Sequence, residues 1–342
     1  MTPLDAIEHL VGLQAQTPHT WYAGLWARLA GFDPEVVARL LLDRHVVRIA
    51  LMRSTVHLAS AADALALRPL LTSVGERSFR SNFGKNLAGL DLEEVAAAGR
   101  AALDEHPLIF SELGRELGKL WPGRDEASLA QVVRAYVPLV QVPPRGVWGA
   151  RGRSAHAPLE SWVGKDLARD YSVDEMVGRY LGAFGPASVR DVQVWSGLTR
   201  LREVLDRLRP RLVTFRDELG VELFDLPDAP RPEPDTPAPA RFLYDFDNLL
   251  LSHADRNRVI TDAYRAQDLD PEGPAPRLIL LDGFTAGFWS TQITRDAAIL
   301  RVRPFGALST QDRDVLTAEG AGLLAFLAPA AVTHDIRFET PA

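Results

Sequence analysis

The chain has 342 residues, of which 46% are hydrophobic and 24% charged, as is typical of a globular protein with a sizeable core. It contains no cysteine, which excludes disulfides and thiolate metal sites, and no uncharged apolar run approaches the ~20 residues that would span a bilayer. The net charge of −7 argues mildly against a polyanionic partner, but acidic and basic residues are segregated along the chain, so this average excludes no partner.

The first 90 residues predict two helices, a strand and a further helix. The start "TPLD" at residues 2–5 has the residue types of a helix N-terminus, and apolar residues then recur at helical spacing. A second helix follows Asp33-Pro34. The β-branched stretch 46–60 predicts a strand, and the alanine- and leucine-rich stretch after Ala61 returns to helix.

Residues 91–163 form the clearest unit of the sequence. Helical patterns cover about 91–105, 110–120 and 126–137. A strand "VPLVQVP", a glycine-rich loop "PRGVWGARGRS" and a returning strand "AHAPLESWV" follow them. Three helices followed by a hairpin is the order of a winged helix, in which the third helix faces the major groove and the hairpin is the wing.

The same order recurs further along the chain. Helices at about 173–183, 188–196 and 199–208 precede two possible strands, "RLVTF" and "VELFDL". Beyond a proline-rich connector, strands, a helix at about 309–326 and a last strand near 334–339 predict a small mixed domain. We therefore predict an α+β, predominantly helical fold of three tandem winged helices and a β-rich C-terminal domain. The predicted boundaries are 1–90, 91–165 and 166–226 for the winged helices, 227–240 for the linker, and 241–342 for the last domain.

Two glutamines near the start, Gln14 and Gln16 in "LVGLQAQTP", raise the question of a shared function. On a helix their side chains would lie about 200° apart, whereas on an extended segment they share a side and Ala15 points away. Thr17 precedes a proline, which disfavours helix there. The geometry favours two carboxamides that project from a helix end into one space. Taken alone, capping of carbonyls or contact with water explains them as well.

Motifs along nearly the whole chain give a family resemblance. "LVGLQAQTP", "LMRSTVHL" (51–58), "FGPASVRDVQVWSGL" (184–198), "FDNLLLSHADR" (246–256) and "LLDGFTAGFW" (280–289) occur in the order found in AlkZ-like DNA glycosylases, which the chain resembles. The family unhooks interstrand crosslinks and excises bulky N-alkylated purines. The resemblance implies three winged helices with a β-rich C-terminal domain, and it implies no metal or other cofactor.

The family's catalytic element is a glutamine, an aliphatic residue and a second glutamine, so the resemblance implies catalytic roles for Gln14 and Gln16. In the related YcaQ branch the second position is an acid. Here Ala15 is a small residue at the middle position, which leaves the pair intact but alters the packing of the segment.

Neutral amides suit this chemistry. A purine alkylated at N7 is cationic and leaves C1′ without a proton from an acid, so the enzyme's task is to place a water molecule against the sugar. A carboxamide can accept a hydrogen bond from that water and donate one to a neighbouring oxygen. Because glutamine is a poor proton acceptor, we expect selectivity for cationic lesions. The chain has lysines only at positions 85, 119 and 165, so no Schiff-base lyase step is expected, and the glycosylase would be monofunctional.

The candidate DNA contacts are basic residues in the stretch 46–60 and in the predicted wing of the second domain, residues 143–158. Each of them also has a purely structural explanation. Arginines in the wing would contact phosphate, although a solvated hairpin tip explains them too. A histidine within the first strand is equally well explained as a buried residue with a partner of its own. The candidates are Arg53, His57, Arg145, Arg151, Arg153 and His156.

Other charged groups favour structural roles. The arginines at 200, 202, 207 and 209 lie on a helix with Glu203 and Asp206, where ion pairs are the better explanation. Asp245, Asp247, His253 and Asp255 have no zinc spacing, and we expect hydrogen bonds there rather than a metal.

The leading hypothesis is thus a monofunctional glycosylase that acts on double-stranded DNA carrying alkylated purines, in repair or in self-resistance to a genotoxic antibiotic. The N-terminus resembles no secretory leader, so we expect a cytoplasmic, nucleoid-associated protein with no membrane contact and no obligate protein partner. The main alternative is a non-catalytic winged-helix regulator, because fold alone does not settle function. A protein that sequesters the toxic small molecule itself is a third interpretation.

Overall fold

The computed structural model describes residues 1–270 and 273–340, so residues 271–272 and 341–342 of the predicted last domain lie outside the described residues. The fold is α+β and mostly helical. The chain divides into two compact units. Unit 1 holds Met1–His19, Asp33–Ala229 and Ser252–Ala254, and unit 2 holds Thr20–Phe32, Pro230–Leu251 and Asp255–Ala342. Within the described ranges, no helix is both long and apolar enough to cross a membrane.

A six-stranded sheet organises unit 1, with the strand order β1-β3-β2-β5-β6-β4. The pairing of β2 with β5 joins strands from the first and second predicted domains into this one sheet. The predicted boundary near residue 90 therefore separates strands that belong to one continuous sheet. The domain boundaries remain predictions. The strands are β1 (Leu13–Gln14), β2 (Val46–Ala50), β3 (Val56–Ser60), β4 (Leu108–Ile109), β5 (Leu139–Gln141) and β6 (Ala155–Pro158).

The elements that the sequence predicted in the first domain begin where it indicated, at Pro3, Pro34, Val46 and Ala61. Thr2 accepts a hydrogen bond from the amide of Asp5, whose carboxylate accepts from the amide of Thr2, so the first helix starts with a capping box. The stretch 46–60 holds two strands rather than one. The helical elements here are α1 (Pro3–His9), α3 (Pro34–Leu42), the 3-10 turn η1 (Met52–Ser54), α4 (Ala61–Leu70), α5 (Thr72–Phe83) and the 3-10 turn η2 (Gly84–Leu87).

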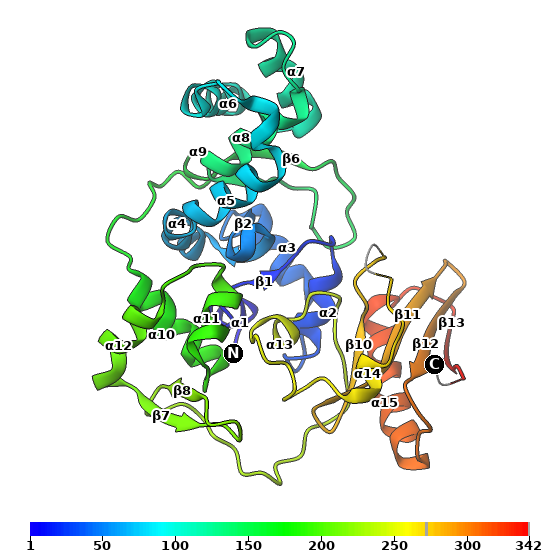
Figure 1. The fold of residues 1–342 in the computed structure, drawn as a ribbon. Coiled ribbons are helices and arrows are strands. Elements are labelled where there is room, and N and C mark those ends of the chain that lie inside the picture. Colours follow the sequence, from blue (N-terminus) through cyan, green and yellow to red (C-terminus); the bar gives the residue numbers. More distant parts are fainter. Residues whose placement is uncertain (271–272, 341–342) are drawn as a thin grey trace. The chain divides into compact units, whose positions relative to one another are not determined.

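The second predicted domain has the expected order of three helices and a hairpin. The helices are α6 (Leu92–Glu105), α7 (Phe110–Leu120) and α8 (Glu126–Tyr136), and the hairpin is β5–β6 (Figure 1). The expectation of a strand throughout 155–163 is wrong in its second half, which is the helix α9 (Leu159–Val163). Its apolar residues, at positions 159, 162 and 163, have the spacing of one helix face rather than the alternation of a strand.

The same order recurs in the third predicted domain. The elements are α10 (Val173–Phe184), α11 (Val189–Ser196), α12 (Arg202–Leu208), the 3-10 turn η3 (Arg209–Arg211), β7 (Val213–Arg216) and β8 (Glu222–Asp225). Ala187 forms an isolated antiparallel bridge with Phe224 of β8, beside the β7–β8 hairpin. Buried residues of α10 and α11, such as Tyr180 and Trp195, share a core cluster with Ile49 of β2.

Unit 2 is built on a five-stranded sheet with the order β13-β12-β11-β10-β9. The predicted turn at Asp282-Gly283 separates two of its strands, and the predicted C-terminal helix packs on this sheet. The stretch 226–240, which contains the proline-rich connector, has no helix or strand. The elements are α2 (Thr20–Trp26), β9 (Arg241–Phe242), α13 (Asn248–Leu251), α14 (Asp262–Arg265), β10 (Leu278–Leu281), β11 (Phe284–Ile293), β12 (Ala297–Pro304), α15 (Thr310–Leu327) and β13 (Thr333–Phe338). The sequence reasoning missed α2 and the two-residue strand β9.

Candidate active site

Gln14 lies in the short strand β1, and Gln16 follows two residues later at a bend, so the extended segment that the sequence predicted covers the first glutamine. The chain leaves α1 through Val11 and Gly12, both with positive φ, and enters β1. A Cβ at Gly12 would approach the carbonyl oxygen of Leu58 to 3.0 Å, so glycine suits this turn. In β1, Gln14 pairs with His57 of β3, and the amide of Ala15 donates to the carbonyl of Val56 at 2.7 Å.

Both carboxamides contact one short segment, residues 53–56. The Oε1 atom of Gln14 accepts a hydrogen bond from Nη2 of Arg53 at 2.7 Å, and Oε1 of Gln16 accepts one from the backbone amide of Val56 at 3.3 Å. Gln14 is buried, with 6% of its surface exposed, whereas Gln16 is exposed. Both side chains are therefore held by the same short segment, and Gln16 is the accessible one.

A buried arginine holds the backbone between the glutamines. The carbonyl of Ala15 accepts from Nη2 of Arg48 at 2.7 Å, and Arg48 is 1% exposed. Gly146 of the second wing has φ +90° and lies against the Arg48 side chain, where a Cβ would come to 2.8 Å from Cδ. The glutamine segment and the wing loop are thus packed on the same guanidinium-bearing side chain.

Arg53 occupies a strained turn between β2 and β3. Arg53 and the following Ser54 have φ values of 56° and 59°, the left-handed region that residues other than glycine seldom adopt. Three contacts stabilise this turn. Nη1 of Arg53 donates to the carbonyl of Trp195 at 2.5 Å, Nη2 of Arg134 donates to the carbonyl of Ser54 at 2.8 Å, and Thr55 donates to the carbonyl of Met52 at 3.0 Å. Strain that is stabilised in this way is common at functional sites.

The two candidate histidines, His57 and His156, are buried and uncharged. Nδ1 of His57 donates to the carbonyl of Thr55 at 2.9 Å, and burial together with the charge of Arg53 lowers its pKa to about 3. His156 stacks on Phe110 with ring centroids 4.1 Å apart, and burial, with smaller contributions from nearby arginines, lowers its pKa to about 4. At 2% and 4% exposure, neither imidazole is placed to meet a phosphate. Their burial favours structural roles, and the role of either histidine as a DNA contact remains an untested prediction.

The wing loop carries the other three candidates, and their environments differ. Arg145 is half-buried and donates to the carbonyl of Gly152 at 3.2 Å, while Arg153 is exposed and paired with Glu112 at 2.5 Å. Arg151 is exposed, and within residues 1–270 and 273–340 it has neither a hydrogen bond nor an ion pair. Of the three, Arg151 is the cation most readily available to a phosphate.

Sequence reasoning missed two residues of this site, His19 and Arg48. Nε2 of His19 donates to the carbonyl of Val147 at 2.9 Å, which ties the wing loop to the segment that follows the glutamines. Burial lowers the pKa of His19, an effect that outweighs this hydrogen bond. Its position in "QAQTPH" was the available signal. For Arg48 the signal was a single charge among the apolar residues of "VVRIA".

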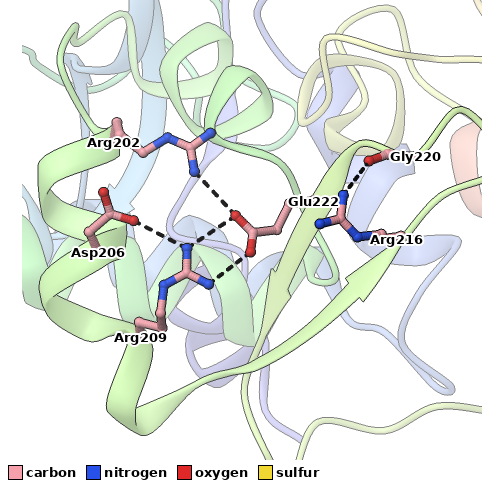
Figure 2. A network of polar contacts seen from close by, with 6 residues as sticks. All are labelled: Arg202, Asp206, Arg209, Arg216, Gly220 and Glu222. Atoms are coloured by element: carbon pink, nitrogen blue, oxygen red, sulfur yellow. Dashed lines mark hydrogen bonds and ion pairs between the residues drawn. The ribbon is translucent and has the colours of Figure 1, made fainter.

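Three of the four arginines predicted to form ion pairs do so, namely Arg202, Arg207 and Arg209, whereas Arg200 lies before α12 and pairs with none of the described residues. Figure 2 shows Arg202 and Arg209 converging on Glu222 of β8, with Asp206 as a second partner of Arg209. These carboxylates raise the pKa of Arg209. Two of the three acidic partners come from neighbouring elements rather than from the same helix. They are Glu222 of β8 and Asp174 of α10, which pairs with Arg207 at 2.6 Å.

The acids and the histidine that raised a metal question have protein partners. In unit 2, Asp247 accepts from Arg28 at 2.6 and 2.8 Å, and Asp245 accepts from Thr20 at 2.7 Å. In unit 1, Nε2 of His253 donates to the carbonyl of Phe184 at 3.0 Å. The part of the chain that the structure describes holds no group of three or more histidine and acidic residues placed to bind a metal ion.

The chain is similar to known proteins along most of its length. The family described as "DNA glycosylase AlkZ-like" matches residues 7–326. The interstrand DNA cross-link repair glycosylase of Streptomyces sahachiroi is 24% identical over 323 residues, which cover 83% of this chain and 81% of that protein. The solved structure of the S. sahachiroi DNA glycosylase AlkZ matches with a TM-score of 0.75 and 22% identity, over 99% of this chain and 94% of that one.

Proposed function

Because this chain belongs to the AlkZ-like DNA glycosylase family, we propose that it is a monofunctional glycosylase that hydrolyses the N-glycosidic bond of bulky, cationic N7-alkylated purines. The proposed range includes the unhooking of interstrand crosslinks, in DNA repair or in self-resistance to a genotoxin. The family implies a DNA substrate. The observation that carries the proposal is that Gln14 and Gln16 each accept a hydrogen bond from the same short segment, residues 53–56.

In the proposed reaction the glutamines position a water molecule. The oxygen of that water attacks C1′ of the damaged nucleotide as the bond from C1′ to the purine nitrogen breaks. The bonding electrons pass to the purine and neutralise its positive charge, and the proton of the water passes to solvent. Each carboxamide oxygen has a second lone pair beyond the one engaged by the protein, and each amide nitrogen has two donors. The pair can therefore orient water without a charged base.

We propose three tandem winged helices as the DNA-binding scaffold. Support comes from the repeated order of helices and hairpin at α6–β6 and α10–β8, with a shorter version from α1 to β3. In this scaffold Arg151 and Arg145 of the second wing meet the DNA backbone. Arg153, which is exposed, would exchange its half-buried partner Glu112 for a phosphate. Arg53 already engages Gln14 and the carbonyl of Trp195, so its contribution lies at the glutamine pair.

Base release from defined lesions tests the proposal. The protein is incubated with a duplex that contains a single N7-methylguanine, and with a duplex that carries a nitrogen-mustard crosslink. For the N7-methylguanine duplex, the free base is quantified against spontaneous depurination. For the crosslink, where the cleaved purine stays attached to the opposite strand, separation of the two strands under denaturing conditions is measured instead. We expect release of the alkylated base, an alkali-labile strand that stays intact before alkali, and no release of undamaged guanine. A protein that binds these duplexes but releases no base above the spontaneous rate would be a winged-helix regulator, and the proposal would fail.

A further inference from the structure

We propose that Arg53 is a positioning residue that fixes which end of the Gln14 carboxamide faces the substrate. This inference rests on the proposed function. A guanidinium has only donors, so the amide must turn its oxygen towards Arg53 and its nitrogen away from it. The 2.7 Å contact between Nη2 and Oε1 and the burial of Gln14 hold that orientation.

The consequence is a division of labour between the glutamines. Gln14 presents its two N–H groups and binds an oxygen atom, either of the attacking water or of the DNA backbone. Gln16 is exposed, and its contact with the amide of Val56 is longer, at 3.3 Å, so this side chain is freer to turn its oxygen towards a hydrogen of the water. One carboxamide is thus a fixed donor and the other an adjustable acceptor.

The surroundings of Arg53 are suited to hold a guanidinium in one place. One nitrogen donates to Gln14, and the other donates to the carbonyl of Trp195 at 2.5 Å, near the end of α11. Gly197, just beyond that helix, lies so close that a Cβ there would come to 3.3 Å from the backbone nitrogen of Arg53. A lysine ammonium lacks the planar fork that makes both contacts at once.

The first test replaces Gln14 by glutamate, which keeps the acceptor oxygen and removes the N–H donors, and by alanine, which removes both. In Q14E the carboxylate accepts from Arg53 but offers no N–H, so excision of N7-methylguanine at saturating enzyme should fall as far as it does in Q14A. Under the alternative that Gln14 works through an oxygen, Q14E would excise at close to the wild-type rate. That outcome would overturn the proposal. The affinity for the duplex then tells which oxygen Gln14 binds. It falls in Q14E if that oxygen belongs to the DNA backbone, and it does not fall if the oxygen belongs to the attacking water.

The second test compares R53M with a matched control, R77M. Nη2 of Arg77 donates to the carbonyl of Gly197 at 2.6 Å, so this residue anchors the same helix end without a contact to either glutamine. We expect single-turnover excision to fall about tenfold or more in R53M, with partial recovery in R53K, and to stay near the wild-type rate in R77M. If Arg53 acts through Gln14, the double variant R53M/Q14A is no slower than Q14A alone. Equal losses in R53M and R77M would reduce Arg53 to a structural anchor.

A readout that does not depend on activity separates this inference from the proposed function. The side-chain amide resonances of Gln14, identified by their loss in Q14A, should shift in R53M and stay in place in R77M. If they shift as expected but wild-type protein releases no base, the proposed function fails while the orientation of Gln14 stands. If wild-type protein excises and R53M changes neither the rate nor the resonances, the positioning role fails and the glycosylase assignment survives.

Discussion

Acidification should destabilise this protein through its two buried histidines, His57 and His156. Their pKa values in the folded chain are about 3 and about 4, below the ordinary 6.5 that applies once the chain unfolds. The unfolded state therefore binds more protons below about pH 6.5, and folding stability falls as the pH falls. The stability that the neutral histidines contribute is fully present at pH values above the unfolded pKa of 6.5. It is lost progressively as the pH falls towards the folded pKa values of about 4 and about 3.

The magnitude follows from the distance below the unfolded pKa. At about pH 5 each histidine is ~1.5 units below it, and at about 1.4 kcal/mol per unit each costs roughly 2 kcal/mol, or about 4 kcal/mol together. Urea unfolding at a series of pH values between about 6.5 and 5 measures this slope, and H57N and H156Q should each flatten it by about half. An unchanged slope in both variants would mean that these imidazoles are not buried and neutral, which would contradict the structural roles inferred from their burial.

Two further predictions concern the wing and the turn. R151A should weaken binding to DNA and reduce the slope of log affinity against log salt concentration by about 1. R153A should have a smaller effect, because Arg153 already has Glu112 as a partner. Salt titrations followed by fluorescence anisotropy measure these slopes, and equal slopes in the two variants would contradict the prediction. G197A places a Cβ 2.9 Å from Cγ1 of Val74 and 3.3 Å from the backbone of Arg53, so excision and melting temperature should both fall. Its control is G123A, which shares the positive φ but has nothing within 4 Å, and an equal loss in both variants would assign the effect to backbone strain alone.

Local patterns predicted much of the fold. Helix starts carry their own caps, as at Thr2 and Ser309, and apolar periodicity placed α6, α7 and α8 within one or two residues. The end of the first helix before Gln14 also followed from local residues, because a proline follows shortly after. These features depend on neighbours in sequence, which a single chain displays.

The contacts that complete the site could not be predicted, because they join residues far apart in sequence. The pairing of β2 with β5 brings Arg48 opposite Gln141, and the contact of Arg53 with the carbonyl of Trp195 spans 142 positions. The burial of the two histidines likewise depends on tertiary packing. An alternating strand pattern places His57 on a face, but it does not say whether that face meets solvent.

The double variant Q14A/Q16A tests the central claim most directly. Single-turnover release of N7-methylguanine from a defined duplex is measured beside equilibrium binding of the same duplex and thermal unfolding of the protein. We predict that base release falls to the spontaneous rate while duplex affinity stays close to that of the wild type, because the carboxamides act on the water rather than on the bulk of the DNA. Release at the wild-type rate by a folded double variant would contradict the account.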